Sequence, residues 1–491
     1  MEGGGRMIEF QNVSFSYPNG SDGGLKNIDL TIPDGQCVLL CGRSGCGKTT
    51  LTRLINGLIP QFFAGDLTGK VLLDGEDLAD LPMYRIAKKV GSVFQNPRTQ
   101  FFNVDTDSEI AFGMENEALP QEQLKHRVAE TAAALHIENL LGRNIFALSG
   151  GEKQKIAFAS VYAMNPEVYL LDEPSSNLDM TAIGELKEHL KLIKSQGKTA
   201  IVAEHRLYYM MDVADRIIYL ENGRIASDFT PEQFQKIPPE QRQIMGLRAI
   251  ALQEERPICL ASSAAASVLE LKNVTLAYQK QSVLQNISLK AAPGDVIAVV
   301  GHNGAGETTF SRALCGLHKE IVGEYLWNGK PQKPKERMKR SYMIMQDVNY
   351  QLFAESVEAE CTFGIKYSDT ALAKRTLEEL GLAPFQERHP NTLSGGQKQR
   401  LAAATSMVCG KELLVFDEPT SGLDYDSMIR LSSLVRRLAD IGKIIFIVTH
   451  DYEFVCRTCG RVLHLDNGGI RDDLTVTEDN LPQIKDIFDV R

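Results

Sequence analysis

The chain has 491 residues, so two to four domains of about 100–200 residues each are expected. Hydrophobic residues form 43% and charged residues 24% of the chain, a balance that excludes wholesale disorder. The formal net charge of −10 disfavours general nucleic-acid binding, which needs an excess of Lys and Arg. No apolar run reaches the ~18 residues of a membrane-spanning helix, and nine irregularly spaced cysteines favour reduced thiols in a cytosol.

A phosphate-binding motif follows the first strongly apolar strand pattern, Val38 to Cys41. The residues GRSGCGKT, starting at Gly42, match the P-loop pattern. Glycines permit a tight turn that points N–H groups at phosphate oxygens, and a helix beginning there adds its positive end. Lys48 would reach the β- and γ-phosphates, and the Thr49 hydroxyl would bind Mg²⁺.

The segment LSGGEKQ comes next, ahead of an amphipathic helical pattern. Its residues Ser149, Gly150 and Gly151 would form a second anion-binding nest that lacks a lysine of its own. An ordinary helix cap with glycines explains a single copy equally well. A second copy with the same downstream spacing favours the binding site.

Acidic residues and a histidine follow two further apolar strand patterns. Asp172 and Glu173 end the strand VYLLDEP, where Asp172 would orient Mg²⁺ and Glu173 would polarise the attacking water. Two adjacent acids at a buried strand end are costly unless they meet a cation. His205 ends the pattern TAIVAEH and would hydrogen-bond the γ-phosphate or the attacking water.

These motifs recur in the second half of the chain. The signature, the acid pair and the histidine repeat with one offset of 245 residues, and the P-loop repeats with an offset of 259. The repeated residues are Ser394, Gly395, Gly396, Asp417, Glu418 and His450. A period near 250 residues indicates two tandem domains and not a solenoid. Continuous apolar strands alternating with helices predict an α/β fold with a mainly parallel sheet.

The composition between the repeats predicts the domain limits. We expect a first domain over residues 7–250 that ends in a helical extension, and a second over 268–491. Residues 251–267, rich in Ala and Ser, are expected to form the linker. The basic stretch from Lys330 to Arg340 is most simply a solvated loop.

One motif residue changes charge between the copies. Glu307 stands where the first P-loop has Lys48. At an effective dielectric near 20 and ~4 Å, each such charge contributes about 4 kcal/mol, so a cation becoming an anion would repel a triphosphate. The alternative is that backbone amides hold the nucleotide regardless. We predict weak ATP binding and no fast hydrolysis at the second loop.

Together these motifs resemble the ATP-binding cassette (ABC) ATPases, over nearly the whole chain and twice. The resemblance implies that each domain adds an antiparallel β-subdomain and a helical subdomain to the parallel sheet. It also implies that the two cassettes pair head to tail, with ATP between the P-loop of one and the signature of the other. The loops NLD and GLD, ending at Asp179 and Asp424, match the segment that couples the two sites in that family.

The resemblance assigns residues to both sites, with ATP and Mg²⁺ as cofactors. The first site would use Tyr17 against adenine, and Gly42, Ser44, Gly45, Gly47, Lys48, Thr49, Thr50, Gln95, Asp172, Glu173 and His205, with Ser394, Gly395 and Gly396. The second would use Tyr278, Gly301, Asn303, Gly304, Gly306, Thr308, Thr309, Gln346, Asp417, Glu418 and His450, with Ser149, Gly150 and Gly151. The Mg²⁺ ligands would be Thr49, Gln95 and Asp172 in one site, and Thr308, Gln346 and Asp417 in the other.

The segments after the two glutamines bear on the partners. VFQNPRTQ and EIAFGMEN resemble ATPase subunits of energy-coupling-factor (ECF) importers for vitamins and transition-metal ions. The resemblance implies an integral membrane scaffold, a small substrate-capture membrane protein, and peripheral attachment at the cytoplasmic face. The pairs Phe101/Phe102 and Leu352/Phe353 would suit grooves that receive a partner's helices, or would simply be core residues.

Three other functions remain open. Tandem sugar-importer ATPases have similar length, but their second signature usually departs from LSGGQ, and here both signatures are intact. Ribosome-acting cassette proteins need no membrane partner, but they carry a long charged linker, unlike this one. A non-catalytic nucleotide sensor conflicts with the presence of Lys48, Glu173 and His205.

Overall fold

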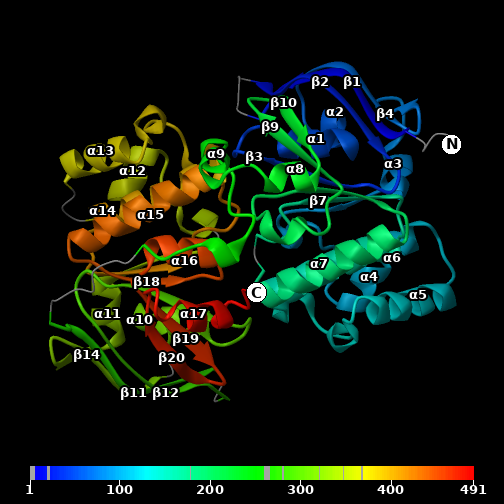
Figure 1. The fold of residues 1–491 in the computed structure, drawn as a ribbon. Helices are drawn as coiled ribbons and strands as arrows, with labels where there is room; N and C mark the ends of the chain where they lie inside the picture. The colour runs from blue at the N-terminus through cyan, green and yellow to red at the C-terminus, as the bar shows by residue number, and fades with distance from the viewer. Residues whose placement is uncertain are drawn as a thin grey trace. The chain divides into compact units, whose positions relative to one another are not determined.

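The computed structural model describes residues 6–18, 23–176, 178–258, 266–278, 281–319, 321–346, 348–365 and 369–490. It divides into two compact units (Figure 1). The first unit comprises the chain up to residue 251 together with 424–426, and the second unit comprises the remainder from residue 252. Each unit is described by itself.

The first unit contains ten strands and nine α-helices among the described residues. Its strands are β1 (Arg6–Ser16), β2 (Leu25–Pro33), β3 (Cys37–Gly42), β4 (Asp66–Leu73), β5 (Glu76–Asp77), β6 (Val90–Val93), β7 (Val168–Asp172), β8 (Thr199–Ala203), β9 (Arg216–Glu221) and β10 (Arg224–Phe229). Its helices are α1 (Lys48–Ile55), α2 (Leu58–Gln61), α3 (Met83–Lys89), α4 (Thr106–Asn116), α5 (Gln121–Ala134), α6 (Gly150–Ala163), α7 (Met180–Ser195), α8 (Pro231–Gln235) and α9 (Pro239–Ile244).

A six-stranded sheet forms the centre of the first unit, in the order β10-β9-β3-β8-β7-β6. All of its strands run parallel except β10, which is antiparallel to β9. Both faces are covered: Val38 and Leu40 of β3 enter one hydrophobic core, while Leu39 and Cys41 enter the other. Burial on both faces explains why the strand sequence is continuously apolar. Because β3, β7 and β8 are parallel, their carboxyl ends meet at one edge of the sheet, and the motif residues that follow them lie there.

Two further parts complete the first unit. The strands β2-β1-β4-β5 form an antiparallel sheet that packs on the core containing Val38. Helices α4, α5 and α6 pack together as a helical part (Figure 1). The predicted α/β fold, with a mainly parallel sheet and an antiparallel sheet, is confirmed.

The second unit repeats this architecture, with sheets β12-β11-β14-β15 and β16-β17-β18-β13-β19-β20. Its strands are β11 (Leu269–Tyr278), β12 (Gln281–Ala291), β13 (Val296–Gly301), β14 (Ile321–Trp327), β15 (Lys330–Pro331), β16 (Ser341–Ile344), β17 (Leu413–Asp417), β18 (Ile444–Val448), β19 (Arg461–Asp466) and β20 (Gly469–Thr475). Its helices are α10 (Glu307–Leu314), α11 (Pro334–Arg340), α12 (Val357–Thr362), α13 (Thr370–Glu379), α14 (Gly395–Val408), α15 (Tyr425–Asp440), α16 (Tyr452–Thr458) and α17 (Leu481–Ile487).

The composition of the basic stretch from Lys330 to Arg340 predicted a solvated loop, and this prediction is wrong. Most of it is helix α11, which starts with Pro334 and is capped where Glu336 accepts a hydrogen bond from the Lys333 N–H at 2.7 Å. Arg337 is only 4% exposed and donates to the carbonyl oxygen of Ala313. The helix therefore packs on the unit through a buried arginine, which cannot be told from an exposed one in the sequence pattern.

The segment between the repeats is partly packed. Of the predicted linker, residues 259–265 lie outside the described part of the chain. Before them, Glu255 pairs with Arg457 at 2.9 Å, and the Ile258 N–H donates to the carbonyl oxygen of Cys456 at 2.9 Å. Both contacts tie the segment to α16. Across the described ranges, no helix combines the length and apolar character needed to cross a bilayer.

Candidate functional site

The first candidate site begins at the loop of residues 42–47, between β3 and α1. The backbone angle φ is 145° at Gly42 and 109° at Gly47, values that other residues rarely adopt. A Cβ atom at Gly42 would lie 2.3 Å from the carbonyl oxygen of Leu220, and one at Gly47 would lie 2.6 Å from the Leu25 side chain. Both positions therefore require glycine. The loop leads into the N-terminus of α1, where N–H groups without helical partners favour phosphate.

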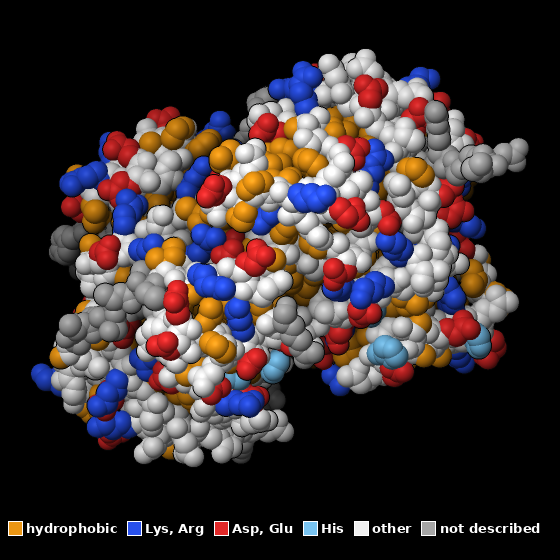
Figure 2. Space-filling model, viewed as in Figure 1, with side chains coloured by type: hydrophobic (Ala, Val, Ile, Leu, Met, Phe, Trp, Pro, Cys, Tyr) orange, Lys and Arg blue, Asp and Glu red, His pale blue; other side chains and the backbone are white. Residues whose placement is uncertain are grey.

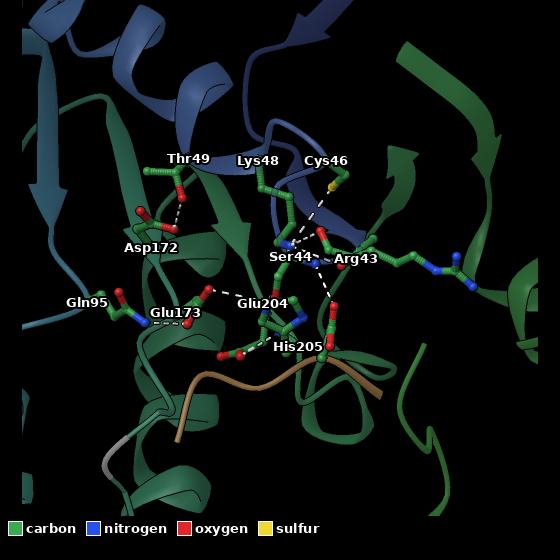
Figure 3. Close-up of polar contacts among 12 residues, drawn as sticks. Arg43, Ser44, Cys46, Lys48, Thr49, Gln95, Asp172, Glu173, Glu204 and His205 are labelled. Atoms are coloured by element: carbon green, nitrogen blue, oxygen red, sulfur yellow. Dashed lines mark hydrogen bonds and ion pairs between the residues drawn. The ribbon is translucent and has the colours of Figure 1, made fainter. Parts of the chain in front are cut away.

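Lys48, the first residue of α1, directs its ammonium group back into this loop (Figure 3). The residue is 5% exposed, and its Nζ donates to the carbonyl oxygens of Gly42 at 3.0 Å and Arg43 at 3.2 Å. The same Nζ lies 3.4 Å from Nε2 of His205. The structure thus brings together two predicted site residues that are 157 positions apart. Their meeting point suits the outer phosphates of a nucleotide.

Asp172, the last residue of β7, points towards Thr49 of α1 (Figure 3). The Thr49 hydroxyl donates to Oδ1 of Asp172 at 3.4 Å. Burial and the neighbouring Glu173 carboxylate raise the pKa of Asp172 to about 6. A hydroxyl and a carboxylate oxygen side by side are hard ligands of the kind Mg²⁺ prefers, and a cation would offset the cost of burying the acid.

Within the described residues, no group of three or more His, Cys, Asp or Glu side chains could hold a metal ion. Mg²⁺ commonly takes one or two protein ligands and completes its shell with phosphate oxygens and water. Thr49 and Asp172 fit that pattern.

Glu173 lies where three predicted site residues converge (Figure 3). Its Oε1 is 3.4 Å from Nε2 of His205, and Nε2 of Gln95 donates to its Oε2 at 2.5 Å. Burial acts to raise the pKa of Glu173, but His205, Lys48 and Gln95 outweigh it and hold the pKa below its usual value. The carboxylate is therefore kept ionised, as a general base must be.

Tyr17 is held beside α1 rather than free at the surface. Its hydroxyl is 3.0 Å from Oγ1 of Thr50 and accepts a hydrogen bond from Nη1 of Arg53 at 3.1 Å. Its ring packs edge-on against Phe15, with centroids 4.8 Å apart. The predicted adenine contact is thus fixed in position relative to the phosphate loop; its stacking on a base stays a prediction.

The signature residues start the two helices α6 and α14. Oγ of Ser149 accepts from the Glu152 N–H at 3.3 Å, and the Glu152 carboxylate accepts from the Ser149 N–H at 2.8 Å. Ser394 and Gln397 form the same reciprocal cap, at 3.4 and 2.9 Å. Both signatures are therefore helix caps as well as candidate anion nests. Their pairing with the opposite P-loop stays a prediction.

The second candidate site repeats the frame of the first with a different charge. Glu307 begins α10 and is 7% exposed, and its Oε2 lies 3.9 Å from Nε2 of His450. That nitrogen is also 3.3 Å from Oε1 of Glu418. Burial and Glu418 raise the pKa of Asp417 to about 6. The carboxylates of Glu307 and Glu418 thus both lie near the His450 imidazole, where the His205 imidazole has Lys48 and Glu173.

The other residues predicted for the second site keep their places in the frame. Gly304 and Gly306 have φ of 90° and 102°, close to the 77° and 109° of Gly45 and Gly47, whereas Gly301 lacks the positive φ of Gly42. The remaining predicted residues lie as follows: Gly301 ends β13, Asn303 is in the loop, Thr308 and Thr309 are in the first turn of α10, and Gln346 follows β16. Tyr278, the predicted adenine contact of the second site, is 60% exposed.

Two further residues predicted for the first site, Ser44 and Gly45, are exposed at the turn of the first loop.

A groove opens beside the glutamine segment of the first unit. It has a volume of about 240 Å³ and a mainly apolar lining, with contributions from α3, α4 and α6. Phe102 is 74% exposed and stacks on Phe112, both at the groove, with ring centroids 4.8 Å apart. Phe101 instead packs against the core. The pair Leu352 and Phe353 divides likewise, at 5% and 68% exposed, so only the second member of each pair faces outward.

Sequence reasoning missed two residues at the first site. Glu204 and Arg206 flank His205 and are 2% and 7% exposed, so both are buried charges at the edge of the site. The signal was present: the first copy reads Glu-His-Arg where the second reads Thr-His-Asp. The repeat drew attention to the shared histidine, and the difference between its neighbours in the two copies was not used.

Charges of both signs are interspersed on the visible face of the molecule (Figure 2). On this face the Lys and Arg side chains are not gathered into one patch.

Comparison with known proteins identifies the family. Residues 25–176 and 284–421 match the family described as "ABC transporter". A "Putative ABC transporter ATP-binding protein" of Treponema denticola is 51% identical over 474 residues, covering 95% of this chain and 97% of that protein. A second protein of that description from the same organism is 39% identical and covers 95% of this chain and 96% of its own length.

A solved structure has a similar fold. A model of ribosome-bound archaeal Pelota and ABCE1 contains a chain with a TM-score of 0.69 and 19% identity, covering 96% of this chain and 80% of that one. At this identity the likeness concerns the fold alone. ATP-binding subunits of ABC transporters bind ATP and Mg²⁺ and act with membrane transporter subunits. This chain belongs to the ABC transporter family, as an ATP-hydrolysing subunit that carries two ABC domains in one polypeptide.

Proposed function

We propose that this chain hydrolyses ATP at its first site to drive uptake of a small solute, such as a vitamin or a transition-metal ion, through separate ECF-type membrane subunits. The chain would lie at the cytoplasmic face of the membrane, against an integral scaffold that also binds a small substrate-capture protein. The segments VFQNPRTQ and EIAFGMEN, with their resemblance to ECF-type ATPases, support this choice of partner.

The proposed reaction adds water to the γ-phosphorus of ATP and releases ADP and phosphate. Glu173, kept ionised, would take the proton of the attacking water, and His205 at 3.4 Å would orient the water or the γ-phosphate. Lys48 would hold the outer phosphates against the glycine loop. Mg²⁺ bound at Thr49 and Asp172 would neutralise charge on the phosphate oxygens. Gln95 would fix the Glu173 carboxylate through their hydrogen bond.

The observation that carries the transport function is the apolar groove beside Gln95. Phe102, which is 74% exposed, and Phe112 lie together at the edge of this groove, and contiguous apolar surface of this kind is typical of a protein-interaction site. The groove is lined by α4 and α6, so an occupant would touch the helix that starts with the signature. A helix from a membrane subunit, with apolar side chains on one face, fits this chemistry.

Substitution of Phe102 tests this docking role. Phe102→Asp should abolish co-purification of the membrane subunits while ATP binding by the chain stays within about twofold, because the charge enters the groove and not the nucleotide site. Ile441→Asp is the matched control, since Ile441 is 64% exposed on the other unit and should keep the partner. Retention of the membrane subunits by the Phe102 variant would contradict the groove assignment.

The proposal includes an asymmetry between the two sites. Glu307, beside Glu418 and His450, puts a carboxylate where the first P-loop has a lysine, so the second site is expected to bind ATP weakly and to hydrolyse it slowly. Head-to-tail pairing, in which Ser394, Gly395 and Gly396 complete the first site, is part of the same proposal. The intact second signature supports that assignment, because it serves the site that keeps its lysine.

Co-purification in gentle detergent, from the cells in which the chain is native, discriminates between the alternatives. A stoichiometric integral scaffold with a small membrane protein would support ECF-type import, and a bound vitamin or metal would name the solute. Two scaffold proteins with an extracellular sugar-binding protein would favour the sugar-importer alternative. Ribosomes in place of any membrane protein would remove transport from the proposal and leave the ATPase intact.

A further inference from the structure

The carboxylate of Glu204 is buried at the end of β8 and fully engaged. Its Oε1 accepts from the N–H of His205 at 2.7 Å and of Arg206 at 3.1 Å. Its Oε2 accepts from the Tyr209 hydroxyl at 2.9 Å and from the Ser175 N–H at 3.3 Å. Four donors explain how a carboxylate that is 2% exposed is tolerated.

Arg206 binds the same segment from its other side. Its Nη1 donates to the carbonyl oxygens of Ser175 and Leu178, each at 3.2 Å. Ser175 therefore has its N–H tied to Glu204 and its carbonyl oxygen tied to Arg206. Ser175 and Leu178, which follow Glu173 in the chain, are thus hydrogen-bonded to the two residues that flank His205 in sequence.

A third bond completes the connection at the reacting groups. The Glu173 N–H donates to the carbonyl oxygen of Ala203 at 2.8 Å. Glu173 and His205, whose side chains meet at 3.4 Å (Figure 3), therefore stand on two backbone segments that are joined by hydrogen bonds of residues 203, 204 and 206. Catalytic geometry is sensitive to misplacement, and a 1 Å shift can cost about 100-fold in rate.

Glu204 and Arg206, together with Tyr209, form what we call the clamp, and the second unit has a different side chain at each of the three positions. At the offset of 245, Glu204, Arg206 and Tyr209 correspond to Thr449, Asp451 and Phe454. There the Thr449 hydroxyl accepts from the Asp451 N–H at 3.2 Å. Oδ1 of Asp451 accepts from the Phe454 N–H at 3.1 Å and so caps α16.

The replacement changes what these positions can bind. A carboxylate has no N–H to offer backbone carbonyls, and phenylalanine has no hydroxyl. The side chains of the second unit therefore cannot reproduce the donors of Arg206 and Tyr209. The clamp occurs in the unit that keeps the P-loop lysine, and its counterpart is changed in the unit that carries Glu307.

We propose that Glu204 and Arg206 are positioning residues that bind the backbone of Ser175 and Leu178 to the strand end at His205, and thereby hold Glu173 and His205 in register for hydrolysis at the first site. The proposal rests on the roles proposed above for Glu173 and His205. It adds that the asymmetry between the sites extends beyond Glu307, into the backbone support of the general base.

Arg206→Met in the full chain tests the clamp. It should lower kcat for ATP by about 10- to 100-fold while KM and the Kd for the fluorescent analogue TNP-ATP change less than about threefold, because the phosphate loop is untouched. Arg206→Lys, which keeps a cation and donors, should recover part of kcat. A fall in kcat that matches a fall in TNP-ATP binding would overturn the proposal, since it would mean general loss of structure.

A transplant variant guards against simple misfolding. Glu204→Thr, Arg206→Asp and Tyr209→Phe together install the side chains that the second unit already accommodates in the same frame. This triple variant should bind TNP-ATP normally and still lose kcat at least tenfold. Full kcat in the triple variant would overturn the positioning role.

Arg216→Met is the matched control. Arg216 also donates to a backbone carbonyl, that of Thr31 at 2.7 Å, but pairs beside Val38 at the opposite end of β3 from the P-loop. It should lose thermal stability without a specific loss of kcat. Glu173→Gln separates the two proposals: a Glu173→Gln chain that hydrolyses ATP at the parental rate refutes the proposed general base, whereas an unaffected Arg206 variant refutes only the clamp.

Discussion

The two units share one backbone frame but carry different chemistry at the place where a triphosphate would sit. The histidine lies 3.4 Å from the glutamate in the first unit and 3.3 Å in the second. The P-loop glycines Gly47 and Gly306 have φ of 109° and 102°, although the next residue is Lys48 in one and Glu307 in the other. Glycines shape the loop, and the side chain after them sets its charge. Fold and activity are thus specified by different residues of the same motif.

The strongest way to break this comparison is to remove the general base from each unit in turn. Glu173→Gln should lower the hydrolysis rate at least about 100-fold, because the amide cannot take a proton from the attacking water. Glu418→Gln should leave the rate within about twofold if the first site performs the hydrolysis. Steady-state phosphate release by the full chain measures both. Equal losses in the two variants would show that the sites work alike, against the asymmetry.

A charge exchange sharpens the comparison at the P-loops. Glu307→Lys should tighten nucleotide binding at the second site by about tenfold or more, since about 1.4 kcal/mol of restored attraction suffices for that factor. Lys48→Glu, the reciprocal variant, should weaken the first site to a comparable extent. Equilibrium binding of ATP with Mg²⁺ gives both stoichiometry and affinity. Unchanged values in the Glu307→Lys chain would mean that backbone amides dominate binding.

Much of the frame could be predicted because its signals are local. Apolar runs such as Val38 to Cys41 gave the strands, and the spacing of motifs placed Lys48, Asp172, Glu173 and His205 at one sheet edge. Those residues meet because parallel strands end together. A repeated pattern in one chain also separates rigid positions from variable ones, which is why the motif residues could be named singly.

The clamp could not be predicted in the same way. It depends on contacts between segments about 30 residues apart, and nothing in the local pattern shows that Arg206 reaches the carbonyl oxygens of Ser175 and Leu178. The helix α11 was missed for a related reason, since Arg337 reads as a surface charge until its contact with Ala313 is seen. A charged side chain that binds backbone carbonyls in the interior resembles a solvated one in sequence.

The smallest predicted difference between the units concerns acid stability. His189 of α7 is 8% exposed, stacks on Phe158, and lies 3.2 Å from the carbonyl oxygen of Leu135, whereas its counterpart at the offset of 245 is Leu434. Burial lowers the pKa of His189 below its unfolded value near 6.5. The unfolded state therefore binds the extra proton, and the stability of the first unit is complete above pH ~6.5 and falls as the pH drops below it.

His189→Leu, which installs the side chain found in the second unit, should remove this acid sensitivity. The linkage amounts to at most about 1 kcal/mol between pH 6.5 and 5.5, so a local measurement is needed. Amide hydrogen exchange of α7, compared between parent and variant at each pH, should show parental protection falling towards pH 5.5 while that of the variant falls less. His126→Gln, at an exposed histidine of α5, should behave as the parent does. If the parent and His189→Leu lost protection equally in acid, the buried imidazole would not be the cause, and the two units would be alike in this respect.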